Sequence, residues 1–166
     1  MTNSFGRSIA VGFAAVALAV GGSATSAAAN DSRAATVTAN GAIVAADGAQ
    51  IGQITIHKRG DGTQPPAELG NPSEWGVIEV PASAARTLGS TCLDHVSGGK
   101  WCYGTELVTS GKRCFSNYLH NSKTHASAVK MAGVWDKSGP TSKTKVARSW
   151  YTAGAGYTCN TYYSVD

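Results

Sequence analysis

Two histidines flank a predicted turn in the second half of the chain, and they are the best candidates for chemistry. His120 and His125 lie on either side of Asn121-Ser122, a pair typical of turns. An ammonium charge, imidazole donors and backbone amides at a tight turn suit an anion, and aromatic rings can stack against sugar rings. The candidate ligand-binding residues are Trp101, Tyr103, Asn117, Tyr118, His120, Lys123 and His125.

The same residues also have a structural interpretation, which the sequence leaves open. Trp101 and Tyr118 could be core residues, and the histidines could cap turns through ordinary hydrogen bonds. A zinc site is not expected, because two imidazoles five residues apart with no evident carboxylate lack the spacing of known sites. No metal and no cofactor is therefore predicted.

Catalysis is not expected in this chain. An enzyme would need a nucleophile with a base, or a pair of carboxylates. A hydrolase built on Asp94-His95 beside a serine lacks the G-x-S-x-G turn that would support it. Acids are also scarce in the second half, where they are Asp94, Glu106, Asp136 and Asp166.

The cysteines form an even set that lies wholly in the second half: Cys92, Cys102, Cys114 and Cys159. In an exported chain an even number favours disulfides, and a domain of about 75 residues gains stability from them. Three pairings are open. Cys92 with Cys102 and Cys114 with Cys159 is preferred, because the first closes a short loop and the second ties the start of the domain to its end.

Charge is unevenly spread along the 166 residues, whose formal net charge is +4. Residues 30–91 carry four basic and six acidic side chains, whereas residues 92–166 carry nine basic and four acidic ones. This excess is far from the concentrated basic patch of a nucleic-acid-binding protein, and no nucleic-acid partner is expected. The scattered lysines either discourage pairing between strand edges or attract the protein to an anionic envelope.

The first 29 residues have the layout of a secretory signal peptide. Arg7 precedes an apolar run from Ile9 to Val20, and small residues follow up to Ala29. That run is well short of the roughly 20 residues that a membrane-spanning helix needs. The sequence therefore predicts cleavage after Ala29 and a secreted, extracellular protein with no membrane span.

The remaining residues divide into a flexible leader or linker at 30–89 and an all-β domain at 90–166. The leader is poor in large apolar side chains up to about Gln50, so it can bury little surface to offset the entropy of ordering. One or two short strands are predicted within it, at Ile51–His57 and Trp75–Val80.

The domain at 90–166 shows short alternating segments between turn signals and no sustained helical period. This pattern predicts five or six strands in a β-sandwich or barrel. The clearest strand candidates are Lys100–Tyr103, Cys114–His120, Ser127–Trp135, Thr144–Tyr151 and Tyr157–Val165.

Several motifs of this domain recur together in a known family. The most specific is the run from Ser116 to His125, followed by Ser127 and Val129; the weaker ones are Gly98–Gly104, Gly133-Val134-Trp135 and Tyr162-Tyr163. Over about residues 90–166 the chain thus resembles the lactococcin 972 family of secreted bacteriocins. The resemblance implies a cleaved signal peptide and a small antiparallel β-sandwich.

The resemblance also implies a partner. The founding member of the family is associated with binding lipid II and blocking septum formation, so the implied partner is an anionic, lipid II-like cell-envelope precursor of bacteria. Its pyrophosphate would meet Lys123 and the two histidines. The founding type lacks both the cysteines and the segment from Asn30 to about Ser90, which could be a pro-region, a spacer or a second interaction surface.

The function predicted first is a secreted antibacterial protein that binds such a precursor and blocks wall and septum synthesis in related bacteria. The alternative is a secreted cell-wall-binding or adhesion module without killing activity, with the acidic N-terminal segment as a stalk. A small secreted hydrolase is the third hypothesis. Exposed strand edges and the resemblance are also compatible with a homodimer.

Overall fold

The computed structural model describes residues 32–83 and 89–166, and it confirms the predicted all-β class. One short 3-10 helix, η1 (Ala67–Leu69), is the only helical element among these residues. None of their helical segments has the length and apolar character needed to cross a bilayer. The predicted signal peptide at 1–29 lies outside the described residues.

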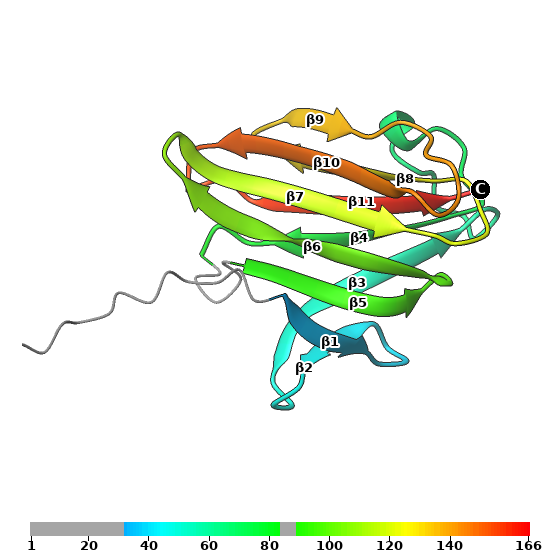
Figure 1. Cartoon of the computed structure of the whole chain (residues 1–166), viewed down its shortest axis with the longest axis horizontal. Helices are drawn as coiled ribbons and strands as arrows, with labels where there is room; N and C mark the ends of the chain where they lie inside the picture. The colour runs from blue at the N-terminus through cyan, green and yellow to red at the C-terminus, as the bar shows by residue number, and fades with distance from the viewer. Residues whose placement is uncertain (1–31, 84–88) are drawn as a thin grey trace, which may run out of the picture.

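Eleven strands form a single sheet (Figure 1). Its order is β10-β7-β6-β5-β1-β2-β3-β4-β11-β8-β9, and neighbouring strands are antiparallel except for the parallel pair β1 and β5. The strands are β1 (Arg33–Val37), β2 (Ala42–Ala45), β3 (Gln50–Lys58), β4 (Glu74–Val80), β5 (Gly89–Val96), β6 (Gly99–Val108), β7 (Gly111–Leu119), β8 (His125–Met131), β9 (Val134–Lys137), β10 (Val146–Ala153) and β11 (Cys159–Val165).

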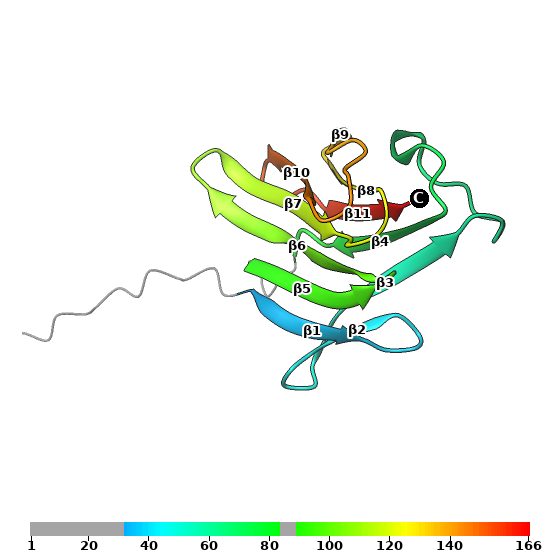
Figure 2. The same cartoon turned by 45° about the vertical axis from the view of Figure 1, so that its right-hand side comes forward.

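The sheet folds back on itself and becomes a sandwich that is nearly closed. Strands β10, β7, β6 and β5 form one layer, and β4, β11, β8 and β9 form the other, with β7 and β10 packed against β8. Strands β1 to β3 connect the layers at the lower side of both views (Figure 1 and Figure 2). At the opposite side the end strands β9 and β10 meet, where the Trp150 amide donates a hydrogen bond of 2.8 Å to the Asp136 carboxylate.

Strict alternation determines which side chains reach the core. In β7 the side chains of Cys114, Ser116 and Tyr118 are buried, and those between them lie on the outer face. Tyr118 stacks on Tyr163 from the opposite layer at 4.7 Å between ring centroids, and Trp101 meets the edge of the same ring. Gly76 leaves room for Tyr163, because a Cβ at this position would lie 2.3 Å from the tyrosine ring.

Both disulfides of the preferred pairing are present. Cys114–Cys159 joins β7 to β11 across the core, with 5.6 Å between the Cα atoms. Cys92–Cys102 links directly opposed residues of the neighbouring strands β5 and β6, with 4.1 Å between the Cα atoms. One bond therefore ties the two layers together, and the other reinforces a single layer.

Residues 33–80 contain four strands, where the sequence predicted one or two. Strands β3 and β4 lie at the predicted positions. Strands β1 and β2 were not predicted, because alanines dominate them and give little apolar alternation. Contacts with other strands stabilise them instead. Ile43 is fully buried against the core, and β1 pairs with both β2 and β5.

The segment Ser127–Trp135, predicted as one strand, is two strands joined by a tight turn. Ala132 and Gly133 form this turn with φ angles of 53° and 79°. Because residues without polar side chains continue from Met131 through the turn to Trp135, the sequence pattern alone does not reveal the reversal. Strand β5 was also missed, so that residues 89–166 hold seven strands instead of five or six.

Candidate functional site

Exposed cations gather at one end of the sandwich, the right-hand end in Figure 1. Lys100 lies near the start of β6, and the register places it opposite Leu119 at the end of β7, which in turn lies opposite Val146 at the start of β10. Two loops, at 120–124 and 138–145, add further lysines beside these strand ends. We call this surface the basic end and define it by Lys100, Lys123, Lys143, Lys145 and Arg148, all of which are exposed.

The charge of the basic end is only partly neutralised. Lys100 lies 3.3 Å from the carboxylate of Asp94, whereas no ion pair between described residues involves the other four cations. Asp166 lies beside the same loop, since its amide donates a hydrogen bond to the Thr124 carbonyl. The basic end therefore has an excess of positive charge that favours an anion.

Two buried histidines hold the loops of the basic end together. His125 Nδ1 lies 3.0 Å from the Lys123 carbonyl oxygen, and its Nε2 lies 2.8 Å from the Lys145 carbonyl oxygen. Both contacts are hydrogen bonds only when the ring carries two protons. The His120 carbonyl also accepts a bond from the Thr144 amide. The histidines thus position the lysines through the backbone.

The turn after β7 differs from the predicted anion site in one respect. The amides of Ser122 and Lys123 both donate to His120 Nδ1, at 3.2 and 3.0 Å. The imidazole thus occupies the position at which an anion would otherwise accept these bonds. An anion that approaches this turn meets the Lys123 ammonium group instead of free backbone amides.

Most of the predicted ligand-binding residues lie in the interior. Trp101, Tyr103, Tyr118, His120 and His125 are buried, with exposed fractions of 5% or less. This placement matches the structural interpretation, in which the aromatic rings pack in the core and the histidines cap turns. Of the predicted set, only Asn117 and Lys123 offer their side chains to a ligand at the surface, and a binding role for the whole set stays a prediction.

Asn117 lies on the outer face of β7, between Cys102 of β6 and Arg148 of β10. Two residues further from the basic end, Trp150 is paired with Phe115 and is 57% exposed. The Arg113 guanidinium lies 5.0 Å from the centroid of the Trp150 ring and also pairs with Glu106. The outer face next to the basic end thus presents the amide of Asn117, the guanidinium of Arg113 and the exposed ring of Trp150.

Ser116 and Ser127 of the most specific motif form a buried network with Ser149 of β10. Ser116 Oγ accepts a bond from the Trp101 indole at 2.9 Å and donates to the Tyr162 carbonyl at 2.8 Å. Ser127 and Ser149 donate to the Ser116 carbonyl from β8 and β10. The motif therefore encodes contacts between the two layers.

Burial changes the acidity of the core tyrosines. Desolvation raises the pKa of Tyr118 above its ordinary value, and the nearby Tyr163 and Glu74 raise it further. Desolvation likewise raises the pKa of Tyr103 and Tyr163. These phenols are neutral at physiological pH, and one of them donates to the backbone: Tyr118 Oη bonds the Val96 carbonyl at 2.9 Å.

Within residues 32–83 and 89–166, no three His, Cys, Asp or Glu side chains are grouped closely enough to hold a metal ion. The fold and the basic end together define a small disulfide-linked β protein that presents a cationic surface.

A comparison with protein families identifies the second half more closely. Residues 97–163 match the model of the Lactococcin_972 bacteriocin family, which confirms the predicted resemblance over this segment. The match supports a bacteriocin-like function and favours a protein that is not an enzyme. No curated protein and no solved structure matches the chain.

The matched segment comprises strands β6 to β11, which lie at the two ends of the sheet order. The five strands β1 to β5 precede the match in sequence and lie between β6 and β11 in the sheet. They therefore bridge the two three-stranded groups that the family segment forms, and they cover an edge of each.

Proposed function

We propose that this protein is a secreted antibacterial protein whose basic end binds an anionic, lipid-linked precursor of the bacterial cell wall and so blocks wall and septum synthesis. The observation that carries the proposal is the match of residues 97–163 to a bacteriocin family. Members of this family are typically secreted, in agreement with the signal peptide that the sequence predicts.

The chemistry of the basic end supports this target. A lipid-linked precursor carries a pyrophosphate, and ammonium groups bind phosphates as point charges. Lys123 and Lys145 are separated by a single imidazole ring, because both carbonyl groups contact His125. Their side chains are exposed and are not needed for these backbone contacts. The backbone positions of the two lysines are thus fixed relative to each other, and neither side chain is paired with an acid among the described residues.

The outer face supports recognition of the sugars that such precursors carry. Trp150 exposes an aromatic ring, and Asn117 supplies an amide that can both donate and accept. Both residues lie on the same face as Arg148. Association of two copies through strand edges stays a prediction of the sequence.

The direct experiment adds the oxidised protein, without residues 1–29, to growing indicator bacteria and records growth and septum formation. Binding to lipid II in vesicles is measured in parallel, with vesicles that contain phosphatidylglycerol as the anionic comparison. We expect inhibition with a division defect, and tighter binding to lipid II vesicles than to the comparison. Binding should weaken as salt rises, because the contact is ionic.

Two matched double variants test whether binding depends on the lysines of the basic end or only on the net charge of the protein. Changing Lys123→Ala together with Lys145→Ala should weaken lipid II binding at least tenfold. Changing Lys130→Ala together with Lys137→Ala, on the opposite layer, removes the same charge and should leave binding within about twofold. Absence of inhibition across a broad panel of strains would refute the antibacterial function, and retention on purified walls without killing would favour the adhesion module.

A further inference from the structure

A groove lies beside the basic end, at the point where the sheet turns from one layer into the other. Strand β1 pairs with β5 only from Arg33 to Ala35 and then diverges from it. The divergence opens a space of about 570 Å³ between β1, β2, β3 and the end of β5. This volume falls within the range of about 300 to 1,000 Å³ that is usual for small-molecule sites.

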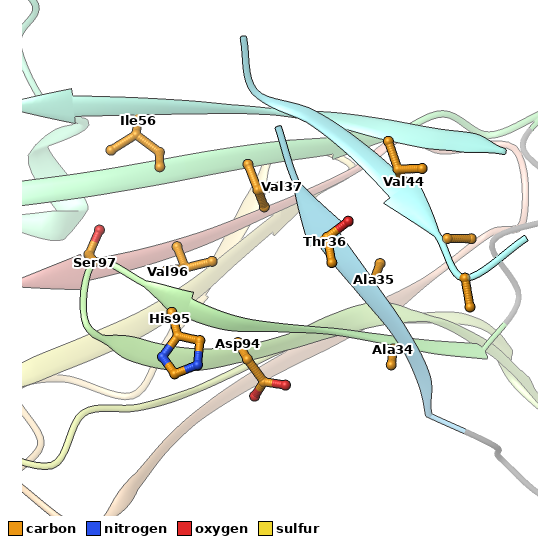
Figure 3. A pocket seen from close by; sticks show the side chains of 12 residues that line it. Ala34, Ala35, Thr36, Val37, Val44, Ile56, Asp94, His95, Val96 and Ser97 are labelled. Atoms are coloured by element: carbon orange, nitrogen blue, oxygen red, sulfur yellow. The ribbon is translucent and has the colours of Figure 1, made fainter. Parts of the chain in front are cut away.

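The lining of the groove is mostly apolar. Figure 3 shows Ile56, Val37 and Val96 around the space, with Val44 and small side chains of β1 along its wall. Ile56 is 41% exposed although it is a large aliphatic residue on a central strand. Small residues at Ala34 and Ala35 leave the groove deep where larger side chains would fill it. An apolar chain would cover this exposed surface.

Apart from Thr36 on β1, the polar residues of the groove are Asp94, His95 and Ser97, which lie at the end of β5 and in the turn after it, next to the basic end. Ser97 lines the groove, and its carbonyl lies 3.2 Å from His120 Nε2. The other nitrogen of the same ring, His120 Nδ1, accepts a hydrogen bond from the Lys123 amide. One imidazole ring therefore separates the end of the apolar groove from the exposed cations.

The acids near this boundary are already engaged. Asp94 pairs with Lys100 at 3.3 Å, and Glu74 accepts a hydrogen bond from the Ser97 hydroxyl, which also contacts the Tyr163 hydroxyl at 2.6 Å. The backbone at the boundary is unusual, because His95 and Ser97 have φ angles of 63° and 49°. Such conformations are costly for residues other than glycine and cluster at ligand sites.

From this juxtaposition we infer that the groove between β1, β3 and β5 takes the hydrocarbon chain of the lipid-linked anion whose head group binds the basic end. The inference rests on the proposed function for the head group, and it assigns a role to strands outside the segment that matches the bacteriocin family. An apolar groove continuous with a cationic surface complements an amphiphile with one charged end.

The test uses farnesyl diphosphate as the probe, below its critical micelle concentration, and the oxidised protein without residues 1–29. Isothermal titration compares this probe with inorganic pyrophosphate, which lacks the chain, and with farnesol, which lacks the charge. We expect farnesyl diphosphate to bind at least tenfold more tightly than either. Equal affinity for farnesyl diphosphate and pyrophosphate would overturn the inference.

Substitutions in the groove test whether the hydrocarbon chain of the probe binds there. Ile56→Asp places a charge in the groove, and Ala46→Trp fills it from an exposed position at its rim. Each should weaken farnesyl diphosphate binding at least tenfold and leave pyrophosphate binding unchanged. Leu107→Asp is the matched control, because Leu107 is 64% exposed and lies outside the groove. Unchanged melting temperatures confirm that each variant is folded.

The outcomes distinguish this inference from the proposed function. In one outcome, Lys123→Ala with Lys145→Ala weakens binding of farnesyl diphosphate and of pyrophosphate, while the groove variants Ile56→Asp and Ala46→Trp change the binding of neither ligand. The head-group site then stands, and the groove assignment is wrong. If farnesol binds as tightly as farnesyl diphosphate and only the groove variants abolish binding, the hydrocarbon site stands and the proposed anion site is wrong.

Discussion

At the scale of single residues, Ser116 carries the most consequential polar contacts of the core. Its hydroxyl accepts from the Trp101 indole and donates to the Tyr162 carbonyl, so it joins β6, β7 and β11. A buried polar group that loses its partner retains the full cost of desolvation. Ser116→Ala removes the acceptor of the buried Trp101 indole and one donor to the Tyr162 carbonyl, although it removes only one oxygen atom.

We therefore expect Ser116→Ala to lower the free energy of unfolding by about 1 to 3 kcal/mol. Urea denaturation followed by tryptophan fluorescence measures this change. Ser142→Ala is the control, since Ser142 is exposed and should alter stability by less than about 0.5 kcal/mol. Equal stability of the two variants would show that the network contributes nothing.

The buried phenols make stability sensitive to alkali. Burial raises the pKa of Tyr118 and Tyr163 above the ordinary value of about 10. Because the folded state resists ionisation, their contribution to stability is complete below pH 10 and is lost as the pH rises from 10 through the raised pKa. The free energy of unfolding should be level from pH 7 to 9 and fall steeply above pH 10.

Absorbance at 295 nm provides the check on this alkaline transition. The buried phenols of Tyr118 and Tyr163 should ionise together with loss of near-ultraviolet circular dichroism. Ionisation of all six tyrosines near pH 10 in a protein that keeps its fold would contradict the burial argument.

Residue chemistry in the sequence selected the turn after β7 as a candidate site, but it could not tell which of the selected side chains are exposed. Alternation predicted that Tyr118 and His120 lie on one face of a strand, yet it cannot say whether that face is the core or the surface. The packing partners, such as Tyr163 from the opposite layer, decide this. The lysines at 143 and 145 join Lys123 only because two loops meet at His125, a contact between distant segments.

At the scale of elements, the turn between β8 and β9 uses a residue that is poorly suited to it. Ala132 has a φ angle of 53° in a two-residue turn, and Gly133 follows at 79°. The left-handed conformation costs a non-glycine residue about 1 to 2 kcal/mol. Asparagine tolerates it, and Asn-Gly is the preferred pair for a turn with two positive φ angles.

Ala132→Asn should therefore stabilise the protein by about 0.5 to 1 kcal/mol. Gly133→Ala, at the neighbouring position, should have the opposite sign. Differential scanning calorimetry compares the melting temperatures of both variants with that of the parent. If both changes lower the melting temperature, the turn is held by something other than its backbone preference.

Clear alternation made β7 and β11 predictable, and weaker patterns indicated β3 and β4, whereas β1 and β2 depend on their neighbours. Strand β1 has few large side chains, and it is stable because it pairs on both edges. The parallel pairing of β1 with β5 joins segments about 58 residues apart, since Arg33 lies opposite Thr91. Local sequence carries no signal for such a contact.

At the scale of the whole molecule, the two disulfides should contribute unequally. Cys114–Cys159 closes a loop of 45 residues and joins the layers, whereas Cys92–Cys102 closes one of 10 within a layer. Loop entropy assigns about 4 kcal/mol to the first and about 2.7 kcal/mol to the second. Replacing each pair by alanines should lower the melting temperature more for Cys114 and Cys159, and the reverse order would reject the entropic account.

The N-terminal strands decide whether the bacteriocin-like segment folds alone. Residues 89–166 without the preceding strands would lose β4, which pairs with β11 at every position from Cys159 to Val165. They would also lose Ile43, Ile54, Ile78 and Val80 from the core. At about 1.5 to 3 kcal/mol for each buried aliphatic side chain, the loss is roughly 6 to 12 kcal/mol.

That loss is comparable with the whole stability of an ordinary domain, about 5 to 15 kcal/mol. Residues 89–166 expressed alone should therefore fail to unfold cooperatively, and light scattering should detect association through the uncovered edge of β11. Removal of residues 1–29 alone is the control and should leave a cooperative monomer or a defined dimer. If the isolated segment were monomeric and melted at the same temperature, strands β1 to β4 would be an accessory layer and not part of the fold that positions the basic end.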